Sequence, residues 1–232
     1  MKVRIKFAKH GPVKFVGHLD TMRYFQKAIR RAELPIAFSG GYSPHMIMSF
    51  AAPLGVGTES DGEYFDMELT ETVSTNEITD RLNKQMVEGF SVVSARQVED
   101  GKASTAMSLV AVADYLVKFR KGLEPEIDWK NKIDEFLAQS EILVMKKTKR
   151  SEKEMDLKAN IYSMHLEDNG IFYQLASASS NYTKPELVTE TFFKWLGEEL
   201  KPFAMQICRL ETYSMDENGK AISLENLGEE VE

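Results

Sequence analysis

The side chains best suited to chemistry are concentrated in residues 17–57. This stretch contains His18 and His45, which are two of only four histidines in the chain, among arginines, lysines, glycines and prolines. Histidine is a general acid/base near neutral pH, and clustered cations attract anions. These residue types predict a site for an anionic ligand. The elements that hold them can be predicted from the pattern of apolar residues.

The first part of the stretch, residues 20–32, is predicted to be a helix with one basic face. Apolar residues recur at helical spacing, at Met22, Phe25, Ile29 and Ala32. Asp20 is the expected N-cap, and Pro35 ends the helix. At about 100° per residue, four cations fall within roughly 100° of arc on the opposite side. We expect these to contact phosphates: Arg23, Lys27, Arg30 and Arg31.

The second part, residues 39–57, is predicted to be a loop that approaches an anion through its backbone. Gly40 and Gly41 permit positive φ, and successive amides in such a turn can form an anion nest. Ser39 and Tyr42 add hydroxyl groups. The segment matches neither the P-loop nor the GxGxxG pattern, so it is not a nucleotide fingerprint. The predicted anion- or RNA-binding set therefore includes Ser39, Gly40, Gly41, Tyr42 and His45.

Catalysis is the alternative interpretation of the two histidines. His18 or His45 is a candidate general base for a metal-independent ribonuclease. The four histidines are scattered, without HxH or HExxH spacing, so no metal site and no cofactor are predicted. Glu63 and Asp66 are expected on the polar rim of a strand. We expect a binding module rather than an enzyme.

Charge is distributed unevenly along the chain. The formal net charge is −7, yet residues 1–58 carry a balance of +7 and the remainder −14. A cationic segment on an acidic protein favours a patch that receives RNA, another phosphate-rich ligand or an acidic protein. The competing interpretation is that these cations pair with acids elsewhere in the fold.

Composition excludes several protein classes. The chain has 232 residues, of which 43% are hydrophobic and 28% charged, as in globular proteins. No apolar run approaches the ~20 residues that span a bilayer, so neither membrane insertion nor a membrane partner is expected. The N-terminus reads as a strand rather than a signal peptide, which favours a cytoplasmic location. The single cysteine, Cys208, excludes an internal disulfide and a cysteine-ligated iron–sulfur cluster.

Periodicity predicts an α+β fold made of two tandem ferredoxin-like units. Strands at 2–9, 47–50, 64–71 and 90–100 and helices at 20–32 and 75–86 give the order βαββαβ. The second half repeats this order, with strands at 114–121, 141–149, 160–167, 170–177 and 203–215 and helices at 128–139 and 184–200.

Three domains follow from these elements. Residues 1–104 form the first unit, 105–216 the second, and 217–232 an acidic tail that we expect to be flexible. The first strand is expected to be half-buried, with Lys2, Arg4 and Lys6 on its solvent face.

The motifs of residues 4–69 resemble a known bacterial family. They include KFAK, HLD, RRAELP, SGGYSPH, PLGVG and EYFD. In this pattern and order they are similar to the N-terminal signature of the radical-SAM-linked family of uncharacterised bacterial proteins. Gly17 and Met46 depart from the pattern, where serine and proline are usual.

The resemblance implies a domain that occurs alone or fused to radical-SAM, cobalamin-type enzymes, and it implies no established activity. The chain lacks the three-cysteine cluster motif, so it is not the radical enzyme itself. A weaker likeness, to the ferredoxin-like RNA-processing endonucleases of CRISPR systems, includes a histidine between the first strand and first helix, as at His18.

We therefore expect an RNA-binding or substrate-presenting companion of a radical-SAM modification enzyme. Two alternatives remain open at this point. One is the ribonuclease with His18 or His45, and the other is a protein-interaction scaffold whose basic face binds an acidic partner.

Overall fold

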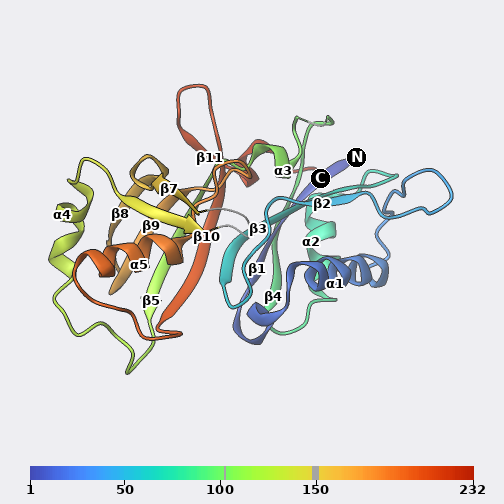
Figure 1. Ribbon diagram of the computed structural model, residues 1–232. Coiled ribbons are helices and arrows are strands. Elements are labelled where there is room, and N and C mark those ends of the chain that lie inside the picture. Colours follow the sequence, from blue (N-terminus) through green and yellow to red (C-terminus); the bar gives the residue numbers. More distant parts are fainter. Residues whose placement is uncertain (102, 148–151) are drawn as a thin grey trace. The chain divides into compact units, whose positions relative to one another are not determined.

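The protein has an α+β fold with two compact units (Figure 1). The computed structural model describes residues 1–101, 103–147 and 152–232. Unit 1 comprises Met1–Ala111 and Arg209–Glu232, and unit 2 comprises Val112–Cys208. The chain therefore divides after Ala111 instead of residue 104. Residues 217–232 belong to unit 1 and do not form a separate tail.

Unit 1 is built on an antiparallel sheet. Strand β1 (Lys2–Lys9) lies between β3 (Glu59–Glu68) and β4 (Phe90–Gln97), and the short β2 (Met48–Phe50) pairs with β3. Strand β10 (Met205–Met215) enters unit 1 at Arg209, lies beside β3 and pairs with β11 (Ala221–Ser223). Gly62 permits the close approach of β3 and β10, because a Cβ there would lie 2.8 Å from the Glu211 Cα.

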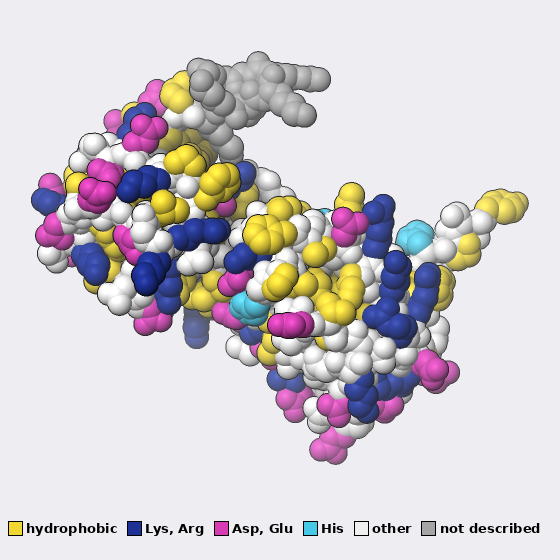
Figure 2. All heavy atoms as spheres, turned by 90° about the horizontal axis from the view of Figure 1, so that it is seen from below, with side chains coloured by type: hydrophobic (Ala, Val, Ile, Leu, Met, Phe, Trp, Pro, Cys, Tyr) yellow, Lys and Arg dark blue, Asp and Glu magenta, His cyan; other side chains and the backbone are white. Residues whose placement is uncertain are grey.

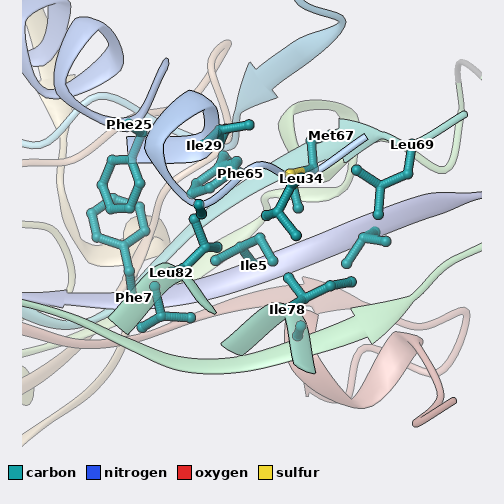
Figure 3. Close-up of a cluster of buried hydrophobic side chains, with 14 of the residues drawn as sticks. Ile5, Phe7, Phe25, Ile29, Leu34, Phe65, Met67, Leu69, Ile78 and Leu82 are labelled. Atoms are coloured by element: carbon teal, nitrogen blue, oxygen red, sulfur yellow. The ribbon is translucent and has the colours of Figure 1, made fainter. Parts of the chain in front are cut away.

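Two helices cover one face of this sheet, α1 (His18–Arg31) and α2 (Thr75–Asn83). Phe25 and Ile29 of α1 are buried as predicted, in a cluster that also contains Ile78 and Leu82 of α2. Figure 3 shows side chains from both helices and the sheet meeting in this cluster. The rings of Phe25 and Phe7 have centroids 4.6 Å apart. The spacing of apolar residues thus identified the face of α1 that packs on the sheet.

The predicted cap of the first helix lies elsewhere. Gly17 is the N-cap of α1, and Asp20 lies in its first turn. Ser74 is the N-cap of α2 and accepts a hydrogen bond from the Glu77 amide. Helix α1 therefore begins at His18 instead of residue 20, whereas α2 begins at Thr75 as predicted.

The polar face of β1 is buried, which corrects the prediction of a half-exposed strand. Arg4 is 1% exposed. Its Nε donates to Asp66 Oδ1 at 2.8 Å and its Nη2 to Asp66 Oδ2 at 3.1 Å. Further donations reach the carbonyl oxygens of Ser104 and Leu224. A charged side chain tolerates this burial because the guanidinium donors are paired.

The C-terminal segment covers that face and is not a flexible tail. It contains β11 and a short 3-10 helix, η4 (Leu224–Leu227). Leu224 is fully buried with Tyr64, Ala106 and Val110. The backbone of Glu229 exchanges two hydrogen bonds with Gln97 of β4, at 2.8 and 2.9 Å. The acidic composition suggested disorder, but the segment supplies carboxylates to cations on the sheet.

Glu225 is one of these carboxylates. It lies 3.1 Å from Lys6 Nζ and 3.5 Å from an Arg96 nitrogen. Burial is the largest single influence on Glu225 and raises its pKa. The Ser94 hydroxyl and the charges of Lys6 and Arg96 together outweigh burial, so the pKa of Glu225 lies below its ordinary value. At this position, the acidic composition of the C-terminal segment reflects pairing with the cations Lys6 and Arg96.

Unit 2 contains the antiparallel strands β5-β9-β8, in that order. These strands are β5 (Val112–Phe119), β8 (Ile161–Glu167) and β9 (Gly170–Ala176). Asp168 and Asn169, with φ of 46° and 59°, make the hairpin turn between β8 and β9. Helix α5 (Pro185–Trp195) begins at Pro185 and packs Phe192 and Phe193 into the core.

Other elements of unit 2 differ from the prediction. The helix expected at 128–139 is a 3-10 turn, η2 (Lys130–Lys132), followed by α4 (Ile133–Leu137). The strand expected at 141–149 is β6 (Leu143–Lys147), which pairs with β7 (Glu152–Asp156) in a separate two-stranded sheet. Residues 148 and 149 lie outside the described residues. The remaining elements are η1 (Gly11–Phe15), α3 (Ala106–Leu109) and η3 (Lys158–Asn160).

The buried C-terminal leucine gives a test of this fold. We expect Leu224→Ala to lower the free energy of unfolding by roughly 2–5 kcal/mol, because it leaves a cavity among Tyr64, Ala106 and Val110. The matched control, Leu227→Ala, removes a side chain that is 37% exposed and should cost less than about 1 kcal/mol. Urea unfolding measures both. Equal, small losses would contradict the packing described for residues 217–232.

Candidate functional site

The four predicted cations of α1 lie on one exposed face. Arg23, Lys27, Arg30 and Arg31 are all exposed. Arg23 contacts Asp20 at 3.1 Å, one turn earlier, and Arg31 donates to the Gln85 carbonyl oxygen at 3.3 Å. The Arg23 pair is exposed on both sides, so it is worth at most about 1 kcal/mol and can rearrange for a ligand.

Lys27 and Arg30 differ from these two in having no partner. Within residues 1–101, 103–147 and 152–232, neither side chain makes an ion pair or hydrogen bond. Glu33 follows Arg30 by three residues, but its side chain does not pair with it; its carbonyl oxygen accepts from Arg81 instead. The centre of the basic face is thus open to solvent and to anions.

The glycine-rich segment forms a closed loop on a short antiparallel arm. Phe38 and Met46 form a bridge, and the Ser39 amide donates to the His45 carbonyl oxygen at 2.9 Å. The Ser39 hydroxyl lies 2.8 Å from His45 Nδ1 and accepts from the His45 amide at 3.1 Å. These contacts close the base, so residues 40–44 form the tip.

The tip of the loop presents an aromatic ring to solvent. Tyr42 is fully exposed, and its neighbours Gly40 and Gly41 are also exposed. Gly41 has φ of 97°, which a residue with a side chain adopts only with strain. The predicted glycine therefore has a conformational role in displaying Tyr42.

The basic face and the loop adjoin each other. Figure 1 shows the loop extending beyond the C-terminal end of α1, and in Figure 2 Lys and Arg side chains gather on the same side of this unit. We call this combined surface, made of the exposed cations of α1 and residues 38–46, the α1–loop surface. The structure thus brings together most of the residues that the sequence singled out.

A groove of about 500 Å³ lies at the base of the loop. Its size is that of pockets for small organic groups. Ser39 and His45 line it together with Lys2, three methionines and two acids, which are Met46, Met48, Met67, Asp66 and Glu68. The groove extends the α1–loop surface into a partly apolar space.

The two candidate histidines are not brought together. His18 is the first residue of α1, whereas His45 belongs to the loop that follows the helix. A helix of 14 residues is about 20 Å long. The His18 ring packs edge-on against Phe50, with centroids 5.6 Å apart. Burial lowers the pKa of His18. Glu63 opposes this effect and Lys9 adds to it. The resulting pKa is below the ordinary value, so the ring is neutral at pH 7.

Lys9 and Glu63, beside His18, were missed by the sequence analysis. Lys9 continues the odd-numbered series of Val3, Ile5 and Phe7, so its position on the buried face could have been noticed. Glu63 was expected on a polar rim but is buried. No local signal reveals this, because its partner is Arg209, 3.0 Å away and 146 positions later in the chain.

Comparison with known proteins identifies a family. Residues 2–185 match the family described as "Uncharacterized protein conserved in bacteria (DUF2344)". The chain belongs to this family. The expected membership in an uncharacterised bacterial family is thus confirmed. The match covers all of the α1–loop surface.

Other comparisons are less informative. No curated protein sequence matches the chain. A solved structure titled "Crystal Structure of a Cbf5-Nop10-Gar1 Complex" contains a similar chain, with 13% identity and a TM-score of 0.46. The similarity covers 93% of this chain and 50% of that one, so this chain spans half the length of the chain it matches. We draw no functional conclusion from that similarity. In the described part of the chain, no helix is both long and apolar enough to span a bilayer.

Proposed function

We propose that the protein binds single-stranded RNA through the α1–loop surface. The observation that carries the proposal is the pair of exposed cations, Lys27 and Arg30, without acidic partners among the described residues, beside a loop that displays Tyr42. The chain as a whole is acidic, with a net charge of −7. An unpaired basic face on such a protein gives this part of the surface a preference for polyanions.

The cations of α1 are suited to phosphate contacts. Residues three and four apart on a helix are neighbours about 5–6 Å apart at Cβ, so Lys27 lies next to Arg23, Arg30 and Arg31. Adjacent phosphates of one strand can then contact successive side chains. Such contacts position a nucleic acid without reading its sequence.

The loop is suited to an unpaired base. Proteins recognise single-stranded RNA by stacking its bases on aromatic side chains. A base can stack on either face of the exposed Tyr42 ring. Ser39 and His45, at the base of the loop, add polar groups that line the groove. This combination favours a single strand over a duplex, whose bases are already stacked.

The fold and the partner extend the proposal. We interpret unit 1 as ferredoxin-like, supported by its βαββαβ element order and by the sheet order β4-β1-β3-β2. We further propose a radical-SAM RNA- or protein-modifying enzyme as partner, with this chain presenting the substrate. The support is the resemblance of residues 4–69. This chain, with one cysteine, would supply binding alone.

Removing two cations tests the phosphate contacts. We expect Arg30→Ala/Arg31→Ala to weaken binding of single-stranded RNA, and to reduce the slope of log affinity against log salt by roughly 1.4, or about 0.7 per lost phosphate contact. Filter binding at several salt concentrations measures both quantities.

The matched control is Lys121→Ala/Lys184→Ala, which removes the same charge from exposed positions of unit 2. It should leave the slope unchanged. Equal effects of the two variants, or no RNA binding by the wild type at low salt, would contradict the proposal. Nuclease-resistant recovery of an acidic protein partner would instead favour the scaffold function.

Tyr42 tests the contact with bases. We expect Tyr42→Ala to weaken binding of single-stranded RNA by about 1–3 kcal/mol, the range for one base stacked on an aromatic ring, while Tyr42→Phe retains affinity. Because Tyr42 is fully exposed, neither variant should change thermal stability. An equal loss for duplex and single-stranded RNA would contradict stacking.

A ribonuclease is the second candidate, favoured by the lowered pKa of His18, which leaves a neutral base at pH 7. If the protein cleaves RNA without added metal, His18→Ala should abolish cleavage. His45→Ala should leave it intact, because His45 lies beyond the other end of α1. Cleavage that survives both substitutions would remove this candidate.

A further inference from the structure

Lys9 is a buried cation with donors to spare. It is 2% exposed, and its ammonium group donates to the Val16 carbonyl oxygen at 2.6 Å. An ammonium group has three N–H donors. Among the described residues, no carboxylate forms an ion pair with Lys9; Glu63 acts on it at longer range. Burial lowers the pKa of Lys9, which shows how poorly its charge is solvated.

The Lys9 side chain lines a small hollow under the start of α1. Phe7, His18, Thr21, Phe50 and Glu63 lie around it. The volume is about 10 Å³, which is close to the space that one oxygen atom with its hydrogens needs. His18, which lines the hollow, is itself only half-buried.

The start of α1 lies beside the hollow, which His18 and Thr21 help to line. Its N-cap is Gly17, which has no side chain to cap the helix. The Thr21 amide donates to the Gly17 carbonyl oxygen, but in the described residues the amides of His18, Leu19 and Asp20 have no acceptor. Free amides and the helix dipole favour an anion at this end of a helix.

The one carboxylate at the hollow is already neutralised. Glu63 accepts two hydrogen bonds from Arg209, at 3.0 and 3.2 Å, and one from Ser60 at 2.8 Å. Glu63 pairs with Arg209 and acts on Lys9 only at longer range, so Lys9 has no carboxylate in direct contact among the described residues. His18 contributes a neutral ring that can donate or accept one hydrogen bond.

We propose that this hollow binds one oxygen atom of an anionic group, a phosphate or a carboxylate, held by the Lys9 ammonium beside the N-terminus of α1, whose dipole favours an anion. The remainder of the ligand lies at the surface beside His18 and Leu19. The site is at the opposite end of α1 from the loop. It does not depend on the α1–loop surface or on the proposed function.

The test uses the His18 ring as a reporter in the full-length protein. Its Cε1–H resonance is assigned with His18→Gln and followed by NMR while inorganic phosphate or acetate is added at constant ionic strength. Binding should give a saturating shift and raise the pKa of His18, because an adjacent anion stabilises the imidazolium. A response to phosphate alone assigns the site to phosphates, and a response to both assigns it to anionic oxygen in general.

Substitution of Lys9 decides its role. We expect Lys9→Met to weaken phosphate binding roughly ten-fold or more, because a charge-assisted hydrogen bond is lost. Lys121→Ala/Lys184→Ala, at exposed positions of unit 2, is the control and should retain wild-type binding here. If Lys9→Met does not fold, the Lys9 Cε resonance of the wild type is followed during the phosphate titration instead. Phosphate should then raise the pKa of Lys9. An unmoved His18 signal, or an unchanged phosphate midpoint in folded Lys9→Met, would overturn the proposal.

Discussion

The ion pair of Arg4 and Asp66 is the contact on which unit 1 depends most. Arg4 sits in the middle of β1 and Asp66 opposite it in β3. Asp66 also accepts from the Ala106 amide at 2.7 Å, and Arg4 donates to the carbonyl oxygens of Ser104 and Leu224. One buried pair thus joins two strands, the start of α3 and the C-terminal segment. Removing either partner would leave an uncompensated buried charge, which costs about 3–5 kcal/mol.

This pairing leaves the other face of the sheet free for apolar packing and the outer face of α1 free for ligands. The aromatic cluster around Phe7, Phe25 and Phe65 holds α1 in place. The cations of α1 point away from that cluster, so they make few contacts within the unit. The basic face is therefore supported by a rigid core and does not itself contribute to it. Such an arrangement is what a binding surface requires.

The two ends of α1 offer different chemistry. Its C-terminal half and the adjoining loop present exposed cations and a tyrosine, which suit a polymer of phosphates and bases. Its N-terminal end presents buried donors around a space of one atom, which suits a single anionic oxygen. Binding at the C-terminal half depends on long-range charge and is sensitive to salt. Binding at the N-terminal end depends on desolvated hydrogen bonds and is less sensitive to salt.

The sequence alone determined the local elements and the family. Apolar spacing identified the buried face of α1, the opposite basic face and most strands, because periods of 3.6 and 2 are local properties of a chain. The positive φ of Gly41 was likewise predictable from residue type. The motifs of residues 4–69 indicated the bacterial family.

Only the tertiary structure decided which charges are buried and what they do. Arg4 contacts the Leu224 carbonyl oxygen 220 positions away, and Glu63 pairs with Arg209 146 positions away. In sequence, these side chains look the same as solvated ones. The acidic C-terminal segment looked disordered for the same reason, since its partners lie on strands near the other end of the chain. Burial of a charge depends on a partner brought by the fold, and no local pattern contains that partner.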